Sequence, residues 1–240
     1  TGSGLHVHFH LADAESGKNV CLDHADPRGL GAERHQSRTQ KGFHREIRGG
    51  DQRAVRLLRG SPGLRAIHLP NAVEGVDYVF EPAYQPLLKR CEELGLAVLF
   101  HPLDGPPNFH GGPDRLGGTD FIWNTLGFPF ETATLATKFI LSGTLDKFPK
   151  LDIVLPHSGG GFPYVVGRIE HAISKGVVEG AKKLARPFRD YIRRFHYDTL
   201  AYYPETLKFM IDLVGSDRVV IGTDNYATMD VDYPNALAES

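Results

Sequence analysis

The segment PAYQPLLKRCEELGLAVLFHP, residues 82–102, contains both kinds of element that decide the fold. In its first part the apolar side chains are spaced three and four residues apart, as one face of a helix requires: Tyr84, Leu87, Leu88, Cys91 and Leu94. Gly95 ends the predicted helix, and the continuous apolar run 96–100 then predicts a buried strand. Because His101 follows directly, the segment places an imidazole at the carboxyl end of this strand.

Helix-like and strand-like segments alternate along the chain from about Arg53 onward. Short apolar runs that predict strands lie at residues 64–69, 151–155, 195–199 and 219–221. Helices are predicted at residues 130–148, 162–177 and 204–213; Pro163 is tolerated because it falls in a first turn. This alternation favours a parallel sheet with helical crossovers.

The strongest polar candidates all come just after the carboxyl ends of predicted strands, where a (β/α)8 barrel places its active site. An open doubly wound sheet also binds ligands at strand ends, but no glycine-rich phosphate loop follows the first strand. The glycines at 159–161 lack the Walker lysine and the GxGxxG spacing. The sequence therefore predicts an α/β fold and favours a (β/α)8 barrel over an open doubly wound sheet, while 240 residues fit either one large domain or two small ones.

The composition excludes several classes of partner. Of the 240 residues 41% are hydrophobic, which is enough for a sizeable core, and 27 basic residues nearly balance 29 acidic ones. Neither nucleic acid nor a membrane surface is therefore expected as a partner. Two cysteines imply no disulfide framework. No apolar run approaches the ~20 residues of a membrane span, and no signal peptide is recognisable, so the cytoplasm is the expected location.

Residues 23–53 do not fit the alternating pattern. This stretch is dense in Arg and His, has few apolar residues and shows no period of 2 or 3.6. Such a segment can hardly bury enough surface to offset its ordering entropy. We predict an irregular or disordered insertion there and assign it no function.

The N-terminal sequence His6-Val7-His8-Phe9-His10 alternates as a strand does, which places its three imidazoles on one side. Two histidines two residues apart on a strand can chelate one metal ion from a single face. Only two of the three would be ligands, because a catalytic site keeps an open position. A polyhistidine tag or a solvated polar edge is the alternative interpretation.

His101, His157 and Asp224 are the candidates further along the chain. His157 lies in a glycine-rich loop that allows backbone or substrate to come close to its imidazole, and Asp224 follows the last predicted strand. Imidazoles and a carboxylate together can bind a catalytic divalent metal, and the carboxylate can also accept a proton. The alternatives are a structural histidine for His101, a glycine turn at His157 and a helix N-cap at Asp224.

Several other residues are weaker candidates. His68 and Asp198 each end a predicted strand, so a supporting or substrate-contacting role is open to them. His196 alternates with apolar neighbours and is predicted to be buried. Trp123 and Phe128 are assigned to the core or to the rim of the site.

In this order, the motifs resemble the amidohydrolase-2 branch of the amidohydrolase superfamily: HxH at 8–10, FHP at 100–102, PHSGGGFPYxxGR at 156–168 and GTD at 222–224. The resemblance covers residues 5–11 and 54–240 and is most specific over 128–168. The branch includes aminocarboxymuconate-semialdehyde decarboxylase and the γ-resorcylate-type decarboxylases. The resemblance implies a distorted (β/α)8 barrel of the metal-dependent hydrolase superfamily, which forms a single domain over residues 1–240 and binds one divalent metal ion.

The resemblance also assigns roles to single residues. The expected ion is Zn²⁺, with Mn²⁺ or Fe²⁺ as alternatives. Four side chains correspond to the family's metal ligands: His8, His10, His101 and Asp224. His157 corresponds to the catalytic histidine. Arg168 corresponds to an arginine that reaches the substrate carboxylate of a neighbouring subunit, which implies a homodimer or a higher homo-oligomer.

Three features depart from the family pattern. His6 stands where an acidic residue usually precedes the HxH pair. The interval from His10 to His101 is short, as if one or two β/α units were missing, and an early substrate-binding arginine cannot be placed. The sequence ends at Ser240, before the usual last helix. The barrel is therefore expected to be incomplete as the sequence stands.

The predicted function is that of a metal-dependent, non-oxidative decarboxylase, a carbon–carbon lyase acting on a small unsaturated or aromatic carboxylic acid. A bound metal lowers the pKa of water toward ~7, and His157 is then the expected general base. Asp224 would bind metal and relay a proton, while Arg168 would hold a substrate carboxylate through its bidentate guanidinium. A hydrolase or hydratase of an amide or lactone is the alternative on the same site, and a non-catalytic barrel that binds only metal or a partner is the third.

Overall fold

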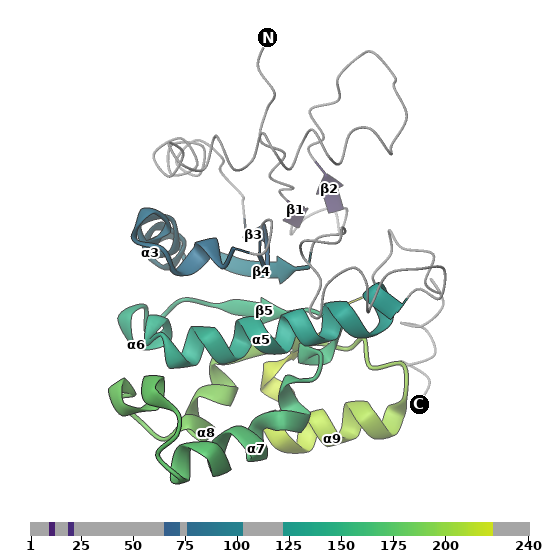
Figure 1. Cartoon of the computed structure of the whole chain (residues 1–240). Helices are drawn as coiled ribbons and strands as arrows, with labels where there is room; N and C mark the ends of the chain where they lie inside the picture. Colours follow the sequence, from purple (N-terminus) through teal and green to yellow (C-terminus); the bar gives the residue numbers. More distant parts are fainter. Residues whose placement is uncertain (1–9, 13–18, 22–64, 73–75, 103–121, 223–240) are drawn as a thin grey trace.

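In the part of the chain that the structure describes, five parallel strands form the sheet around which the protein is built (Figure 1). The computed structural model describes residues 10–12, 19–21, 65–72, 76–102 and 122–222. Within them the sheet has the same order as the sequence: β3 (Ala66–Pro70), β4 (Ala97–His101), β5 (Ile153–Leu155), β6 (Phe195–Asp198) and β7 (Val219–Val220). A doubly wound sheet reverses its strand order at a switch point, and the described strands contain no such reversal. Sequential order is the arrangement that a (β/α)8 barrel requires.

Helices connect the strands as predicted, with corrections at their ends. The principal helices are α3 (Gln85–Leu94), α5 (Phe128–Leu141), α7 (Phe162–Ser174) and α9 (Pro204–Val214). A 3-10 turn at Pro82–Tyr84 precedes α3, and Gly95 ends α3 in the left-handed conformation, with φ of 64°. Pro163 lies in the first turn of α7, as expected. A short helix that the sequence did not predict, α8 (Phe188–Tyr191), lies between α7 and β6.

The single helix predicted over residues 130–148 is wrong, because the chain turns near its middle. Helix α5 ends at Leu141, and a separate short helix, α6 (Thr144–Lys147), follows. Gly143 lies between them with φ of 76°, a conformation that glycine adopts without steric cost. Its amide donates to the carbonyl of Ile140, which closes the end of α5.

The two faces of the parallel sheet differ in burial. Alternate side chains that face the helices are almost fully buried: Ile67, Leu69, Val98, Phe100, Ile153, Leu155, Phe195 and Tyr197. Phe100 of β4 packs against Phe139 of α5 with ring centroids 5.3 Å apart, and α5 packs beside α7 (Figure 1). The other face carries His68, Leu99, His101 and Val154, all of which are partly exposed. The hydrophobic effect therefore anchors one face, while the other, which carries two histidines among aliphatic side chains, stays partly exposed.

The N-terminal strand β1 (His10–Ala12) pairs antiparallel with β2 (Asn19–Cys21). Among the described residues these two strands form a sheet of their own, separate from the five-stranded sheet. The strand character predicted for this region is confirmed at His10. The predicted insertion at 23–53 lies outside the described residues. In the parts of the chain that the structure describes, no helix is long and apolar enough to cross a membrane.

Cys91 offers a test of the packing between α3 and the sheet. Its side chain has no exposed area, and burial raises the pKa of its thiol to about 12. Because only the thiolate is nucleophilic, the thiol should be inert in the folded protein. In a Cys21→Ser variant, which leaves Cys91 as the one cysteine of the chain, an aromatic disulfide reagent should titrate no thiol before unfolding and one after it. Rapid reaction of the folded variant would contradict this packing.

Candidate active site

Two histidines that the sequence placed far apart lie together at the carboxyl edge of the sheet. His101 is the last residue of β4, and His157 opens the loop that follows β5. Their ring centroids are 5.0 Å apart in an edge-on arrangement. His68 of β3 lies on the other side of His101, with a centroid distance of 5.9 Å. Parallel pairing of β3, β4 and β5 thus brings three imidazoles into one row.

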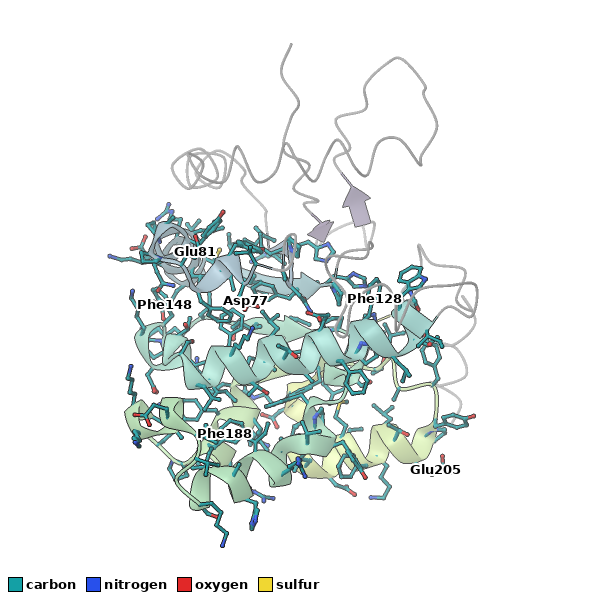
Figure 2. All side chains as sticks on the ribbon, in the orientation of Figure 1. Asp77, Glu81, Phe128, Phe148, Phe188 and Glu205 are labelled. Carbon is teal, nitrogen blue, oxygen red and sulfur yellow. The ribbon has the colours of Figure 1, made fainter. Side chains whose placement is uncertain are left out.

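Phe128 forms a wall beside these histidines. It lies at the start of α5, at the edge toward which the strands point, whereas Phe148 lies at the opposite edge (Figure 2). Its ring stacks on His157 with an interplanar angle of 18° and a centroid distance of 6.2 Å, and it meets His101 edge-on at 5.5 Å. Because Phe128 is only 4% exposed, it shields the two imidazoles from water on this side.

The hydrogen bond made by His101 defines which of its nitrogens is available. Nδ1 lies 2.7 Å from the carbonyl oxygen of Pro102. A carbonyl oxygen can only accept, so Nδ1 carries the proton and donates it. In the neutral ring, Nε2 then keeps its lone pair, and this is the tautomer of a histidine that binds a metal through Nε2.

His157 is a neutral base in a poorly solvated position. Its Nδ1 atom is buried and makes no hydrogen bond within the described part of the chain. Burial, followed by the electrostatic effect of His101, lowers the pKa of His157 to about 3. Desolvation penalises the charged ring, so the imidazole is uncharged near neutral pH and one of its nitrogens has a lone pair for a proton.

The loop that carries His157 has an unusual backbone. His157 and Ser158 both have φ of 53°, in the left-handed region that non-glycine residues rarely adopt. Gly159 and Gly160 follow with φ of 76° and 58°. Each left-handed non-glycine residue costs about 1–3 kcal/mol and persists only where its surroundings hold it. The loop must therefore be fixed by specific contacts.

Asp198, at the end of β6, supplies several of these contacts. Its Oδ2 accepts the backbone N–H of His157 at 3.0 Å, and its Oδ1 accepts the N–H of Ser158 at 2.7 Å. The hydroxyl of Ser158 donates in return to the backbone carbonyl of Asp198 at 3.0 Å. The sequence placed Asp198 only as a weak candidate for a supporting role. The structure shows which contacts it makes, and the sequence could not supply these.

The end of β7 is tied to the same place. The hydroxyl of Thr199 lies 3.3 Å from both the amide nitrogen and the carbonyl oxygen of Gly222. A Cβ at Gly222 would lie 2.7 Å from the Cβ of Asp198, so glycine permits this close approach. The chain segment that leads to Asp224 therefore starts beside Asp198.

The structure describes only some of the predicted site residues. His8 and Asp224 lie outside the described residues, and His10 is described only as part of the β1 backbone. Within the described ranges, no group of three or more His, Cys, Asp or Glu side chains is arranged to hold a metal ion. The four-ligand set therefore stays a prediction. Arg168 lies on the exposed face of α7.

Two assignments from the sequence need adjustment. Phe128, assigned only to the core or rim, stacks directly on the candidate base. His196, predicted to be buried, keeps 24% of its side chain exposed and has Nε2 3.6 Å from a carboxylate oxygen of Asp152. Neither contact has a sequence signal, because both join residues that are distant in the chain.

A pocket of about 280 Å³ opens beside the His157 loop. It is mostly apolar and lies between the start of α5, the start of α7 and α9. Its walls include Pro129, Tyr164, Leu200, Phe209 and Met210. Such a pocket is close to the size that encloses a small organic molecule.

The chain belongs to the amidohydrolase family, whose sequence profile (Amidohydro_2) matches residues 6–239. It is 33% identical to 2-amino-3-carboxymuconate-6-semialdehyde decarboxylase of Dictyostelium discoideum over 178 residues, which cover 74% of this chain and 48% of that protein. The chain thus spans about half the length of this relative.

Solved structures show the same fold. The crystal structure of 2,6-dihydroxybenzoate decarboxylase from Rhizobium matches with a TM-score of 0.69 and 24% identity, over 82% of this chain and 62% of that one. Dihydroxybenzoic acid decarboxylase from Polaromonas, solved with manganese and 2-nitroresorcinol, matches with a TM-score of 0.58 and 27% identity, over 68% and 48% of the two chains. These matches confirm the predicted family and the fold class of the metal-dependent hydrolase barrel.

Gly160 provides a test of the His157 loop. A Cβ at this position would lie 2.2 Å from the carbonyl oxygen of Pro129, and its φ is left-handed. Gly160→Ala should therefore lower the free energy of unfolding by at least about 2 kcal/mol, since neither backbone strain nor the clash can relax cheaply. The measurement is denaturant unfolding followed by circular dichroism.

The neighbouring Gly161 is the matched control. Its φ is −80°, and an added Cβ would meet Ala133 and Phe130 at an ordinary 3.9 Å. Gly161→Ala should change stability by less than about 1 kcal/mol. Equal losses in the two variants would show that this loop conformation is wrong.

Proposed function

We propose that this protein is a metal-dependent, non-oxidative decarboxylase that acts on a small unsaturated or aromatic carboxylic acid. The observation that carries the proposal is the pairing of His101 with the neutral, desolvated His157 at the carboxyl edge of the sheet. The similarity to named decarboxylases supports a carbon–carbon lyase over a hydrolase.

The residues at this edge fit a divalent metal ion. In the neutral ring of His101 the lone pair lies on Nε2, because Nδ1 donates to the carbonyl oxygen of Pro102. Imidazole with carboxylate is a donor set that suits zinc, manganese or iron. We expect the ion to be held by His8, His10, His101 and Asp224, with Zn²⁺ as the first choice and the manganese of the Polaromonas relative as the main alternative. When bound, such an ion supplies Lewis acidity and activates water.

His157 would move the proton. Its uncharged imidazole can accept a proton at a nitrogen and return it to the carbon that loses carbon dioxide. Phe128 covers one face of the ring and restricts the approach of water. Because a poorly hydrated imidazole resists staying protonated, it would give the proton back readily.

Arg168 and a second copy of the chain complete the proposal. Arg168 is exposed on α7 and forms no ion pair with the other described residues. Its guanidinium could make two parallel hydrogen bonds to a carboxylate of a substrate bound by a neighbouring subunit. We therefore propose a homodimer or a higher homo-oligomer.

The buried, free thiol of Cys91 agrees with a reducing compartment, for which we propose the cytoplasm.

A pair of histidine variants tests the role of His157. His157→Ala should lower kcat by at least about 10²-fold, the usual contribution of a general acid or base, with little change in bound metal. His171→Ala, which removes an exposed imidazole from α7, should keep wild-type activity. Turnover would be followed as carbon dioxide release from 2,6-dihydroxybenzoate and from 2-amino-3-carboxymuconate 6-semialdehyde. Unchanged kcat in His157→Ala would refute the role.

Removal of the metal tests whether the reaction depends on a metal ion, and the product formed tests the reaction class. Dialysis against a chelator should abolish carbon dioxide release, and addition of Zn²⁺ or Mn²⁺ should restore it. His101→Ala should lower the metal content measured by elemental analysis, since it removes a proposed ligand. Ring opening of a lactone without carbon dioxide release would indicate a hydrolase instead, and full activity after metal removal would contradict both assignments.

A further inference from the structure

We propose that Asp198 is a positioning residue: its carboxylate fixes the left-handed backbone of His157 and Ser158 and thereby directs the His157 imidazole toward His101. The inference rests on the proposed function of His157 and adds a residue that acts through it. Asp198 need not touch the substrate for this role.

The first support is the hydrogen-bonding of the carboxylate. Asp198 is 7% exposed, and its two oxygens accept the consecutive backbone N–H groups of His157 and Ser158 at 3.0 and 2.7 Å. Consecutive N–H groups that converge on one anion form a concave nest, and bonds to a charged acceptor are stronger than neutral ones. A carboxylate from β6 thus occupies the nest made by the loop after β5.

The second support is that Asp198 is itself held in place. Its Oδ1 also accepts the backbone N–H of Leu200 at 3.0 Å. Gly222 of the chain after β7 packs directly against its side chain. The carboxylate therefore has little freedom to follow the loop if the loop relaxes.

The third support is the strain in the loop. His157 and Ser158 both have φ of 53° without being glycine, so they need an external restraint. A return of His157 to a negative φ would turn its Cα–Cβ bond and carry the ring away from His101. A shift of about 1 Å in a catalytic group can cost 10²-fold in rate, so this restraint bears directly on turnover.

Asp198→Asn is the informative variant because it keeps the size of the side chain. It replaces one acceptor oxygen by an NH2 group, which faces a backbone N–H and cannot bond to it. Ser158→Ala is the matched control: it removes the hydroxyl bond at the same junction but leaves the carboxylate and both N–H bonds in place.

The kinetic experiment uses the full chain loaded with metal and 2,6-dihydroxybenzoate as substrate. Asp198→Asn should lower kcat by about 10²-fold while KM and metal content change by less than about twofold. Ser158→Ala should keep kcat within about threefold of wild type. In a His157→Ala background, Asp198→Asn should cause almost no further loss, because residues that act as a unit are not additive.

The experiment separates failure of the inference from failure of the proposed function. If His157→Ala keeps full activity, the proposed role of His157 fails. If His157→Ala loses activity but Asp198→Asn does not, only the positioning role fails. The positioning role would also be overturned if Asp198→Asn lowered kcat by the same factor in the wild-type and the His157→Ala backgrounds. The effect would then not depend on the imidazole of His157.

A second measurement needs no turnover, and its decisive part uses only the wild-type protein. In the wild-type protein, the amide protons of His157 and Ser158 should exchange slowly with deuterium and resonate downfield, as expected for N–H groups bonded to a buried carboxylate. If Asp198→Asn folds, both resonances should move upfield, whereas in Ser158→Ala they should stay. Rapid exchange of both amides in the wild-type protein would overturn the inference.

Discussion

Parallel pairing of strands in sequence order is the constraint on which the rest of the structure depends. Each of β3, β4, β5 and β6 pairs with the next strand in the chain, so their carboxyl ends meet at one edge. The residues that end these strands are thereby brought together, although His101 and Asp198 are 97 positions apart in the chain. Burial of the helix-facing side chains fixes the sheet and leaves the polar face free for chemistry.

Two close contacts that only glycine permits shape the carboxyl edge of the sheet. Gly160 touches the backbone at Pro129, and Gly222 touches Asp198. The first packs the His157 loop against α5, and the second packs the chain after β7 against β6. Together they place three strand ends within reach of one another, and the hydrogen bonds of Asp198 connect them. The same contacts therefore contribute to stability and to the geometry of the candidate site.

Burial explains why the imidazole of His157 is uncharged near neutral pH. A solvated imidazole is partly charged near neutral pH, whereas His157 is held uncharged by its poorly hydrated position and by His101. The buried ring of Phe128 stacks beside this imidazole and forms part of its apolar surroundings. The chemistry proposed for the site thus depends on a hydrophobic side chain as much as on the polar ones.

The sequence by itself determined the order of strands and helices, the placement of His101 and His157 at strand ends, and the family motifs. It could do so because apolar periodicity and glycine positions report local structure directly. It missed the break at Gly143, because the helical pattern runs on across it, and it left Asp198 as a weak candidate. Only the tertiary structure decided that Asp198 binds the backbone of the His157 loop, that Phe128 stacks on His157, and that burial keeps this imidazole neutral. These properties depend on contacts between residues distant in the chain, and local patterns carry no record of such contacts.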